Sequence, residues 1–269
     1  MKPQVLINPK SIPVNDRAFN YGDGVFETIL VRDGNPLFID QHMKRFYRGC
    51  DVLKIIKPTK KIIRDSIKKS IGKTKNCIVK ILYSRGLSDH GYGYDEYIQP
   101  RLYLIRKRNI QTKPRCFISL GFSEYKLRNN AHLAKIKHLN RLEQILGFNN
   151  IGRGNYDNYI LLDERERIIE CISSNIFFYK LKKDDYNFFS PELSYSGVDG
   201  IMRQSIIEYM KKKKFSITVK DIKKNQIVNF DGAFICNSVS GIQFIKNIQK
   251  HKYQHSKILE STFLKFIYG

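Results

Sequence analysis

The order of apolar patterns along the chain limits what it can fold into. Runs rich in β-branched residues, such as 25–31, 77–83 and 102–105, have the length and composition of strands. Segments with apolar residues at helical spacing, 41–53 and 59–71 among them, separate these runs without a regular alternation. A doubly wound sheet needs helices that alternate with strands, so this order predicts an α+β fold.

Turn and capping signals add detail to this prediction. Asp33-Gly34 lies between two apolar runs and predicts a hairpin, and the charged segment 163–167 predicts a second one. Asp40 and Thr59 belong to residue types that cap helices, so each is expected to begin one. A further helix is expected at 198–210, after a glycine-containing loop.

A chain of 269 residues can form two modest domains, each with its own core. We expect a smaller α/β domain at 1–112, a linker region at 113–122 and a larger domain at 123–269. A strand is predicted at 116–120. Within the larger domain, the polar segment 123–134 is predicted to be irregular, and a final helix is predicted at 258–267.

The chain is strongly basic, with 48 Lys and Arg against 25 Asp and Glu and a formal net charge of +23. A basic protein can bind nucleic acid or an anionic membrane, so a nucleic-acid-binding protein is one alternative. The excess is scattered, and its densest runs, such as 211–214, adjoin apolar residues as solvated helix faces do. We therefore expect neither nucleic acid nor a membrane as a partner.

The five cysteines are widely spaced and form no C-x-x-C pair. This pattern indicates neither a disulfide framework nor a metal site, and favours reduced core thiols in a cytoplasmic protein. No apolar stretch approaches the ~18 residues that a membrane span needs, and the N-terminus lacks a long apolar leader.

Two ionisable residues stand out by their neighbours. Lys137 lies beside Ile136 and Leu139 at a predicted loop-to-helix junction. Burial disfavours the charged form of an amine and makes it a better nucleophile or base. Glu170 ends an apolar strand, where an inward-facing carboxylate needs a cationic partner. Taken singly, either residue is more readily explained as a surface side chain.

Two further places suit a phosphate group. The segment 197–203 joins a glycine-containing loop to the start of a helix, whose exposed amides and dipole attract anions. Arg45, on the first predicted helix, can offer a planar fork of donors. Glycine is common before helices, and Arg45 can equally be a solvated helix residue.

The four candidate features described above occur along the chain in the order found in one protein family. Residues 16–28 resemble the N-terminal signature of the class IV aminotransferases, and His42-x-x-Arg45, 170–177 and 200–203 resemble its later motifs. The resemblance extends from about Leu6 to about Ile245. It implies a two-domain α+β enzyme of fold type IV, with pyridoxal 5'-phosphate at the domain interface.

Within this family, segments 137–144, 197–204 and 235–237 are similar to those of the aminodeoxychorismate lyases. Those enzymes release pyruvate from 4-amino-4-deoxychorismate and yield 4-aminobenzoate for folate synthesis. Aminotransferases for D-amino acids or branched-chain amino acids share the fold and are the nearest alternative. The resemblance also implies a homodimer with a small-molecule substrate.

The resemblance implies roles for single residues. Catalysis is assigned to Lys137, the Schiff-base lysine of the larger domain, and to Thr28, which would assist proton transfer to the leaving pyruvate. The cofactor would be held by Lys137, by Glu170 at the pyridine nitrogen, and at the phosphate by Arg45, Ser238 and the backbone amides of Ile201 and Met202. The chain departs from the subgroup's pattern at His90, where an arginine is expected, and at Ser238, where an alanine is.

Overall fold

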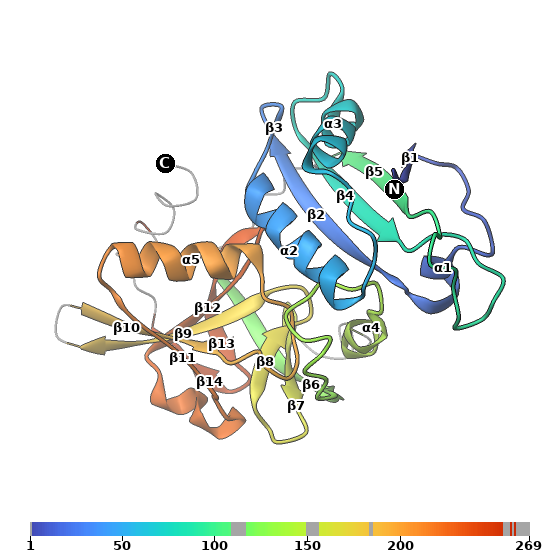
Figure 1. Cartoon of the computed structure of the whole chain (residues 1–269). Helices are drawn as coiled ribbons and strands as arrows, with labels where there is room; N and C mark the ends of the chain where they lie inside the picture. Colours follow the sequence, from blue (N-terminus) through green and yellow to red (C-terminus); the bar gives the residue numbers. More distant parts are fainter. Residues whose placement is uncertain are drawn as a thin grey trace. The chain divides into compact units, whose positions relative to one another are not determined.

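The computed structural model describes residues 2–108, 117–148, 156–182 and 185–254, together with Leu259 and Ser261. Its contacts divide the chain into two compact units, which Figure 1 shows with their helices and strands. Unit 1 comprises Met1–Gln111 and Ile136–Arg141, and unit 2 comprises Thr112–Lys135 and Leu142–Gly269. The segment 136–141 thus packs with unit 1, although the sequence predicted it as part of the second domain.

Unit 1 is built on a five-stranded sheet with the order β1-β5-β4-β2-β3. Its strands are β1 (Gln4–Ile7), β2 (Gly24–Arg32), β3 (Asn35–Pro36), β4 (Cys77–Ser84) and β5 (Arg101–Arg108). β1 pairs in parallel with β5, and the other neighbours are antiparallel. The predicted hairpin at Asp33-Gly34 is confirmed, since it joins β2 to β3.

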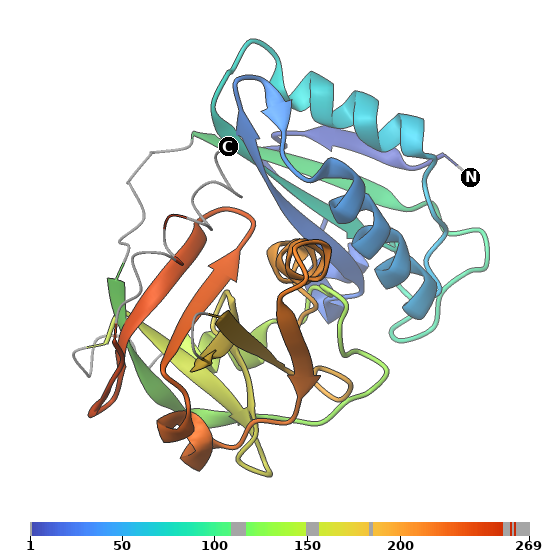
Figure 2. The ribbon, with the colours of Figure 1, turned by 90° about the vertical axis from the view of Figure 1, so that its left-hand side faces the viewer.

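Three helices accompany this sheet: α1 (Arg17–Tyr21), α2 (Ile39–Val52) and α3 (Lys60–Ile71). Figure 2 shows α2 and α3 on the same face of the sheet, where their apolar residues and those of β2, β4 and β5 form one core. Thr59 caps α3 as predicted, because its hydroxyl accepts from the Ile62 amide at 3.3 Å. The prediction for Asp40 is wrong: Phe38 occupies the N-cap position of α2, and Asp40 lies in its first turn.

Unit 2 contains a nine-stranded sheet, whose main path runs β11-β10-β9-β12-β13-β6-β7-β8 while β14 pairs with β13. Its strands are β6 (Phe117–Leu127), β7 (Asn158–Asp163), β8 (Ile168–Cys171), β9 (Asn175–Lys182), β10 (Asp185–Pro191), β11 (Ser216–Lys220), β12 (Gly232–Asn237), β13 (Gly241–Ile248) and β14 (His251–Lys252). Its helices are α4 (Leu142–Phe148), α5 (Ile201–Lys212) and the 3-10 helix η1 (Lys224–Asn229). The predicted hairpin at 163–167 joins β7 to β8, and the helix predicted at 198–210 is α5.

The strand predicted at 116–120 is confirmed as the first part of β6, but β6 is longer than predicted. It runs to Leu127, so the first part of the expected irregular segment 123–134 is also strand. Residues 113–116 lie outside the described residues, as does the predicted helix at 258–267 apart from Leu259 and Ser261.

The cysteines in the described ranges are buried free thiols, as predicted: Cys50, Cys77, Cys171 and Cys236. Burial raises their pKa values above the ordinary thiol value. None of the helices in these ranges is both long and apolar enough to cross a bilayer.

Candidate active site

The segment that carries Lys137 is fixed to strand β2 of unit 1. The Phe26 amide donates to the Lys137 carbonyl at 2.9 Å, and the Leu139 amide donates to the Gly24 carbonyl at 2.9 Å. These two bonds flank an antiparallel bridge between Val25 and His138. Lys137 therefore lies on a short strand-like segment, and α4 begins only at Leu142, so the residue is not directly at the predicted loop-to-helix junction.

The Lys137 side chain is half-buried beside an aromatic ring. Its Nζ atom lies 4.4 Å from the centroid of Phe26. The neighbouring His138 is neutral near pH 7, because burial, together with the charges of Arg141 and Lys137, lowers the pKa of His138 to about 3. The amine of Lys137 thus lies over a ring, and the neighbouring imidazole adds no positive charge near pH 7.

Thr28 lies two residues after Phe26 on β2. Successive strand residues point to opposite faces, so Phe26 and Thr28 share one face and Glu27 lies on the other. Thr28 is half-buried and stands opposite Lys80 of β4. The face of β2 near Lys137 therefore carries the threonine that the sequence assigned to proton transfer.

Arg45 contacts Glu27, on the other face of β2. The Arg45 guanidinium donates from Nε to Glu27 Oε1 at 2.8 Å and from Nη2 to Oε2 at 2.6 Å. His42 Nδ1 lies 2.6 Å from the same Oε2. All three side chains are buried, with exposed fractions of 1% for Glu27 and His42 and 6% for Arg45.

Burial alone would raise the pKa of Glu27. The charges and hydrogen bonds of Arg45 and His42 outweigh burial and lower the pKa of Glu27 to about 2. Glu27 is therefore ionised at neutral pH and compensates the Arg45 charge within the core. The sequence analysis missed Glu27, although its place in the signature before Thr28 could have singled it out.

In unit 2, Glu170 ends strand β8 as a buried carboxylate, with 4% of its surface exposed. Its Oε2 atom accepts from the Val198 amide at 2.8 Å. A Cβ on Gly197 would lie 3.4 Å from the same oxygen and 2.7 Å from Ile169. The carboxylate is therefore held against the glycine-containing loop that leads into α5.

The loop is anchored by Asn175, the first residue of β9. Its side chain donates to the Val198 carbonyl at 2.9 Å and accepts from the Gly200 amide at 3.1 Å. Gly200 is the N-cap of α5 and has no side chain to cap it. The first amides of the helix, which belong to Ile201 and Met202, have no intrahelical acceptor and can bind an anion.

Ser238 follows the last residue of β12. The preceding Asn237 donates to Ser174 Oγ at 3.0 Å, in the turn that follows Glu170 and Cys171. Asn175 is also paired with Cys236 across β9 and β12. Unit 2 thus brings together the predicted residues Glu170, Ile201, Met202 and Ser238.

Chain connectivity links this group to Lys137. The Lys135 amide donates to the Gly197 carbonyl at 2.9 Å, and the Asp199 amide donates to the Lys135 carbonyl at 3.3 Å. Lys135 is thus part of the glycine-containing loop's hydrogen-bond network, and Lys137 is only two residues further along the chain.

The family signature also contains residues that build structure. Asp16 caps α1 and accepts from Ser84 and Tyr103, while Asp23 accepts from the Nε atoms of Arg17 and Arg85 at 2.8 and 2.7 Å. These roles were not predicted from the sequence, because all of these pairs except Arg17–Asp23 are distant along the chain.

In the same region, Arg17 Nη1 donates to the carbonyls of Gly91 and Gly93 at 2.8 Å each. It thereby holds the loop that carries His90 between β4 and β5. His90 itself is exposed, with a side-chain exposed fraction of 68%.

Replacing Gly197 should disturb the loop beside Glu170. Its φ of +85° is unfavourable for L-residues, and a Cβ would overlap Ile169. Gly197→Ala should lower the free energy of unfolding by about 2 kcal/mol or more. Gly34→Ala is the matched control, because φ there is +81° with open space around the Cβ, so only the backbone cost of about 1 kcal/mol applies. If thermal unfolding showed the same loss of unfolding free energy for Gly197→Ala and Gly34→Ala, close packing around Gly197 would contribute nothing to stability.

The residues fit a phosphorylated pyridine aldehyde. A primary amine is half-buried at Lys137, a carboxylate is buried at Glu170, and α5 begins with uncapped amides. A Cβ at Gly200 would lie 2.0 Å from Asn175 Oδ1, so a larger residue would displace the side chain that anchors the loop. Near Glu170, the buried Ser196 hydroxyl has no hydrogen-bond partner among the described residues. These groups offer the donors and acceptors that such a cofactor requires.

The family model "Amino-transferase class IV" matches residues 24–248, and the chain belongs to this family. Its most similar relatives include the aminodeoxychorismate lyase of Vibrio harveyi, which is 29% identical over 248 residues, or 88% of this chain and 87% of the relative. The crystal structure of 4-amino-4-deoxychorismate lyase from Pseudomonas aeruginosa has a TM-score of 0.89 at 27% identity, over 96% of this chain and 95% of that one. The D-alanine aminotransferase of Listeria innocua is 24% identical over 90% of this chain and 83% of its own. The α+β, fold type IV prediction is thereby confirmed.

Proposed function

We propose that the protein is a pyridoxal-phosphate-dependent lyase that converts 4-amino-4-deoxychorismate to 4-aminobenzoate and pyruvate, a step of folate biosynthesis. The similarity to two aminodeoxychorismate lyases over most of the chain supports this substrate. The observation that best supports pyridoxal phosphate as the cofactor is the buried carboxylate of Glu170, which is held beside the loop that leads into α5.

Pyridoxal phosphate, when bound, supplies an aldehyde that condenses with amines and a protonated ring that accepts an electron pair. Glu170 would keep the proton on the ring nitrogen, because a buried carboxylate strongly favours a cation next to it. The Val198 amide orients this carboxylate.

Lys137 would act twice. Its amine would hold the cofactor covalently and, once the substrate's amine has replaced it, would remove the proton from the amine-bearing carbon of the substrate. The bond from the ring carbon to the enolpyruvyl oxygen then breaks, and aromatisation of the ring drives this loss. Thr28 would direct a proton to the departing enolpyruvate, which becomes pyruvate.

The phosphate would be bound by the Ile201 and Met202 amides and by Ser238, whose turn is anchored beside the same loop. Arg45 stays part of this proposal as a hydrogen-bond donor to the phosphate, since its charge is compensated by Glu27. Its Nε and Nη2 atoms are engaged by Glu27, which fixes the direction of the guanidinium.

An assay that supplies chorismate, glutamine and an aminodeoxychorismate synthase tests the substrate. The protein should release 4-aminobenzoate and pyruvate in equal amounts, and heat-inactivated protein should release neither. Amino transfer to a keto acid without 4-aminobenzoate would instead identify an aminotransferase on the same fold.

We also propose a homodimer in the cytoplasm, with neither nucleic acid nor a membrane as partner. Unit 1 exposes several large apolar or aromatic side chains that a second subunit can cover: Val14, Phe19, Tyr92 and Tyr97, with exposed fractions of 79%, 63%, 88% and 77%.

A further inference from the structure

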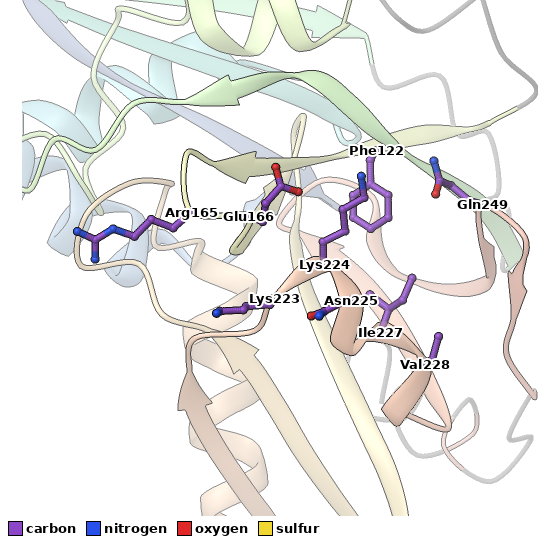
Figure 3. A pocket seen from close by; sticks show the side chains of 9 residues that line it. All are labelled: Phe122, Arg165, Glu166, Lys223, Lys224, Asn225, Ile227, Val228 and Gln249. Atoms are coloured by element: carbon purple, nitrogen blue, oxygen red, sulfur yellow. The ribbon is translucent and has the colours of Figure 1, made fainter.

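Unit 2 contains a cavity of about 540 Å³ whose lining includes none of the residues assigned to the cofactor (Figure 3). It lies at the turn between β7 and β8, which contributes Arg165 and Glu166, and at the start of η1. Glu166 lies in the turn before β8, whereas Glu170 lies near the other end of that strand. The cavity is thus separate from the region of Glu170.

Backbone hydrogen bonds hold the walls of this cavity together. The Lys224 amide donates to the Glu166 carbonyl at 2.9 Å, which joins η1 to the turn. The Gln249 amide donates to the Leu120 carbonyl at 2.8 Å, which joins the end of β13 to β6. The backbone itself thus fixes two walls of the cavity, and small-molecule sites are usually largely preformed in this way.

The lining combines an apolar surface with positive charge. Phe122 is half-buried and Ile227 is buried, and together they offer a ring face and an aliphatic surface. The Lys224 Nζ atom lies 4.9 Å from the Phe122 ring centroid. In Figure 3, Lys224 lies beside Phe122, while Arg165 and Lys223 both point away from this ring.

Negative charge in the lining is weak. Glu166 is the only carboxylate among the described lining residues, and it forms an ion pair with Lys126. The described lining thus contains three cations and one carboxylate that is already paired.

We propose that this cavity binds an organic anion that carries an apolar ring, such as an aryl carboxylate. The ring would pack on Phe122 and Ile227, and the acid group would meet Lys224, with Lys223 and Arg165 adding to the positive field. A volume of about 540 Å³ is within the range of sites for small organic ligands. The proposal does not depend on the proposed reaction, since no catalytic residue takes part.

The probe for this site is 1-anilinonaphthalene-8-sulfonate, titrated by fluorescence into protein saturated with pyridoxal phosphate. Lys224→Gln and Phe122→Ala should each raise its Kd by about five-fold. Lys212→Gln, an exposed lysine at the end of α5, is the charge-matched control and should leave the Kd within about 1.5-fold. If Lys224→Gln and Lys212→Gln weaken binding equally, only the overall charge attracts the probe and the proposal is wrong.

Competition with the probe tests separately whether the ring and the acid group of the ligand contribute to binding. At constant ionic strength, 2-naphthoate should displace the probe, and inorganic phosphate should not. If phosphate displaced the probe as well as 2-naphthoate does, the cavity would bind anions without recognising a ring, and the proposed ring contact with Phe122 would be wrong.

Discussion

Protein with Lys137 replaced by alanine should lose both turnover and the absorbance band near ~400 nm that pyridoxal phosphate gives when bonded to a lysine. We expect activity to fall by on the order of 10³-fold or more, because one residue supplies both the covalent link and the base. The measurement is the visible spectrum with added pyridoxal phosphate, followed by the 4-aminobenzoate assay.

Lys135→Gln is the matched control for this change. Lys135 is a half-buried lysine two residues away, and its Nζ atom contacts Ser194 at 3.2 Å and Glu192 at 3.5 Å. Its replacement should leave the absorbance band in place. A Lys137→Ala protein that kept the band would show that another amine holds the cofactor.

The second large effect is on stability, at the buried charges of unit 1. Glu27→Gln should lower the free energy of unfolding by about 3–5 kcal/mol, because it leaves the Arg45 charge buried without its carboxylate. The chain contains no tryptophan, so denaturant unfolding is best followed by far-ultraviolet circular dichroism.

Asp40→Asn, on the helix α2 that also carries Arg45, is the control for charge removal. Asp40 pairs with Arg64 at 2.5 Å, but their side chains are 81% and 47% exposed, so the loss should stay below about 1 kcal/mol. A Glu27→Gln loss as small as that of Asp40→Asn would contradict the buried ion cluster.

In the unaltered protein, the ion cluster of Glu27, Arg45 and His42 should make the free energy of unfolding fall at acid pH. The pKa of Glu27 is lowered from 4.5 to about 2 on folding, so its contribution is fully present above pH 4.5 and is lost as the pH falls toward 2. Glu27→Gln should therefore remove part of the acid dependence of unfolding between these two values.

Much of the candidate site could be predicted because its signals are local. Lys137 beside apolar neighbours, Glu170 at a strand end and the glycine-containing loop before α5 all appear as short patterns of neighbouring residues. Such patterns depend on backbone geometry over a few residues, which the sequence specifies directly.

The remaining features depend on contacts between distant segments. The sequence indicated Arg45 but not its partner, since the pairing with Glu27 requires the register of α2 on β2. The length of β6 was missed for another reason. Burial alternates from Ser123 to Leu127, as on a half-exposed strand, but its pairing with β7 contains a shift in register, and the polar residues were interpreted as a loop.

Residues 136–141 pack with unit 1 although they follow the first segment of unit 2 in the sequence. This order affects how the chain folds during synthesis. Residues 1–111 leave the ribosome first, yet the amide of Phe26 and the carbonyl of Gly24 gain their partners only after Leu139 has emerged. Unit 1 can therefore complete its fold only after about 30 residues beyond Gln111 have been synthesised, since its last residue is Arg141. A fragment that ends at Gln111 would lack the lysine and also the segment that completes its own fold.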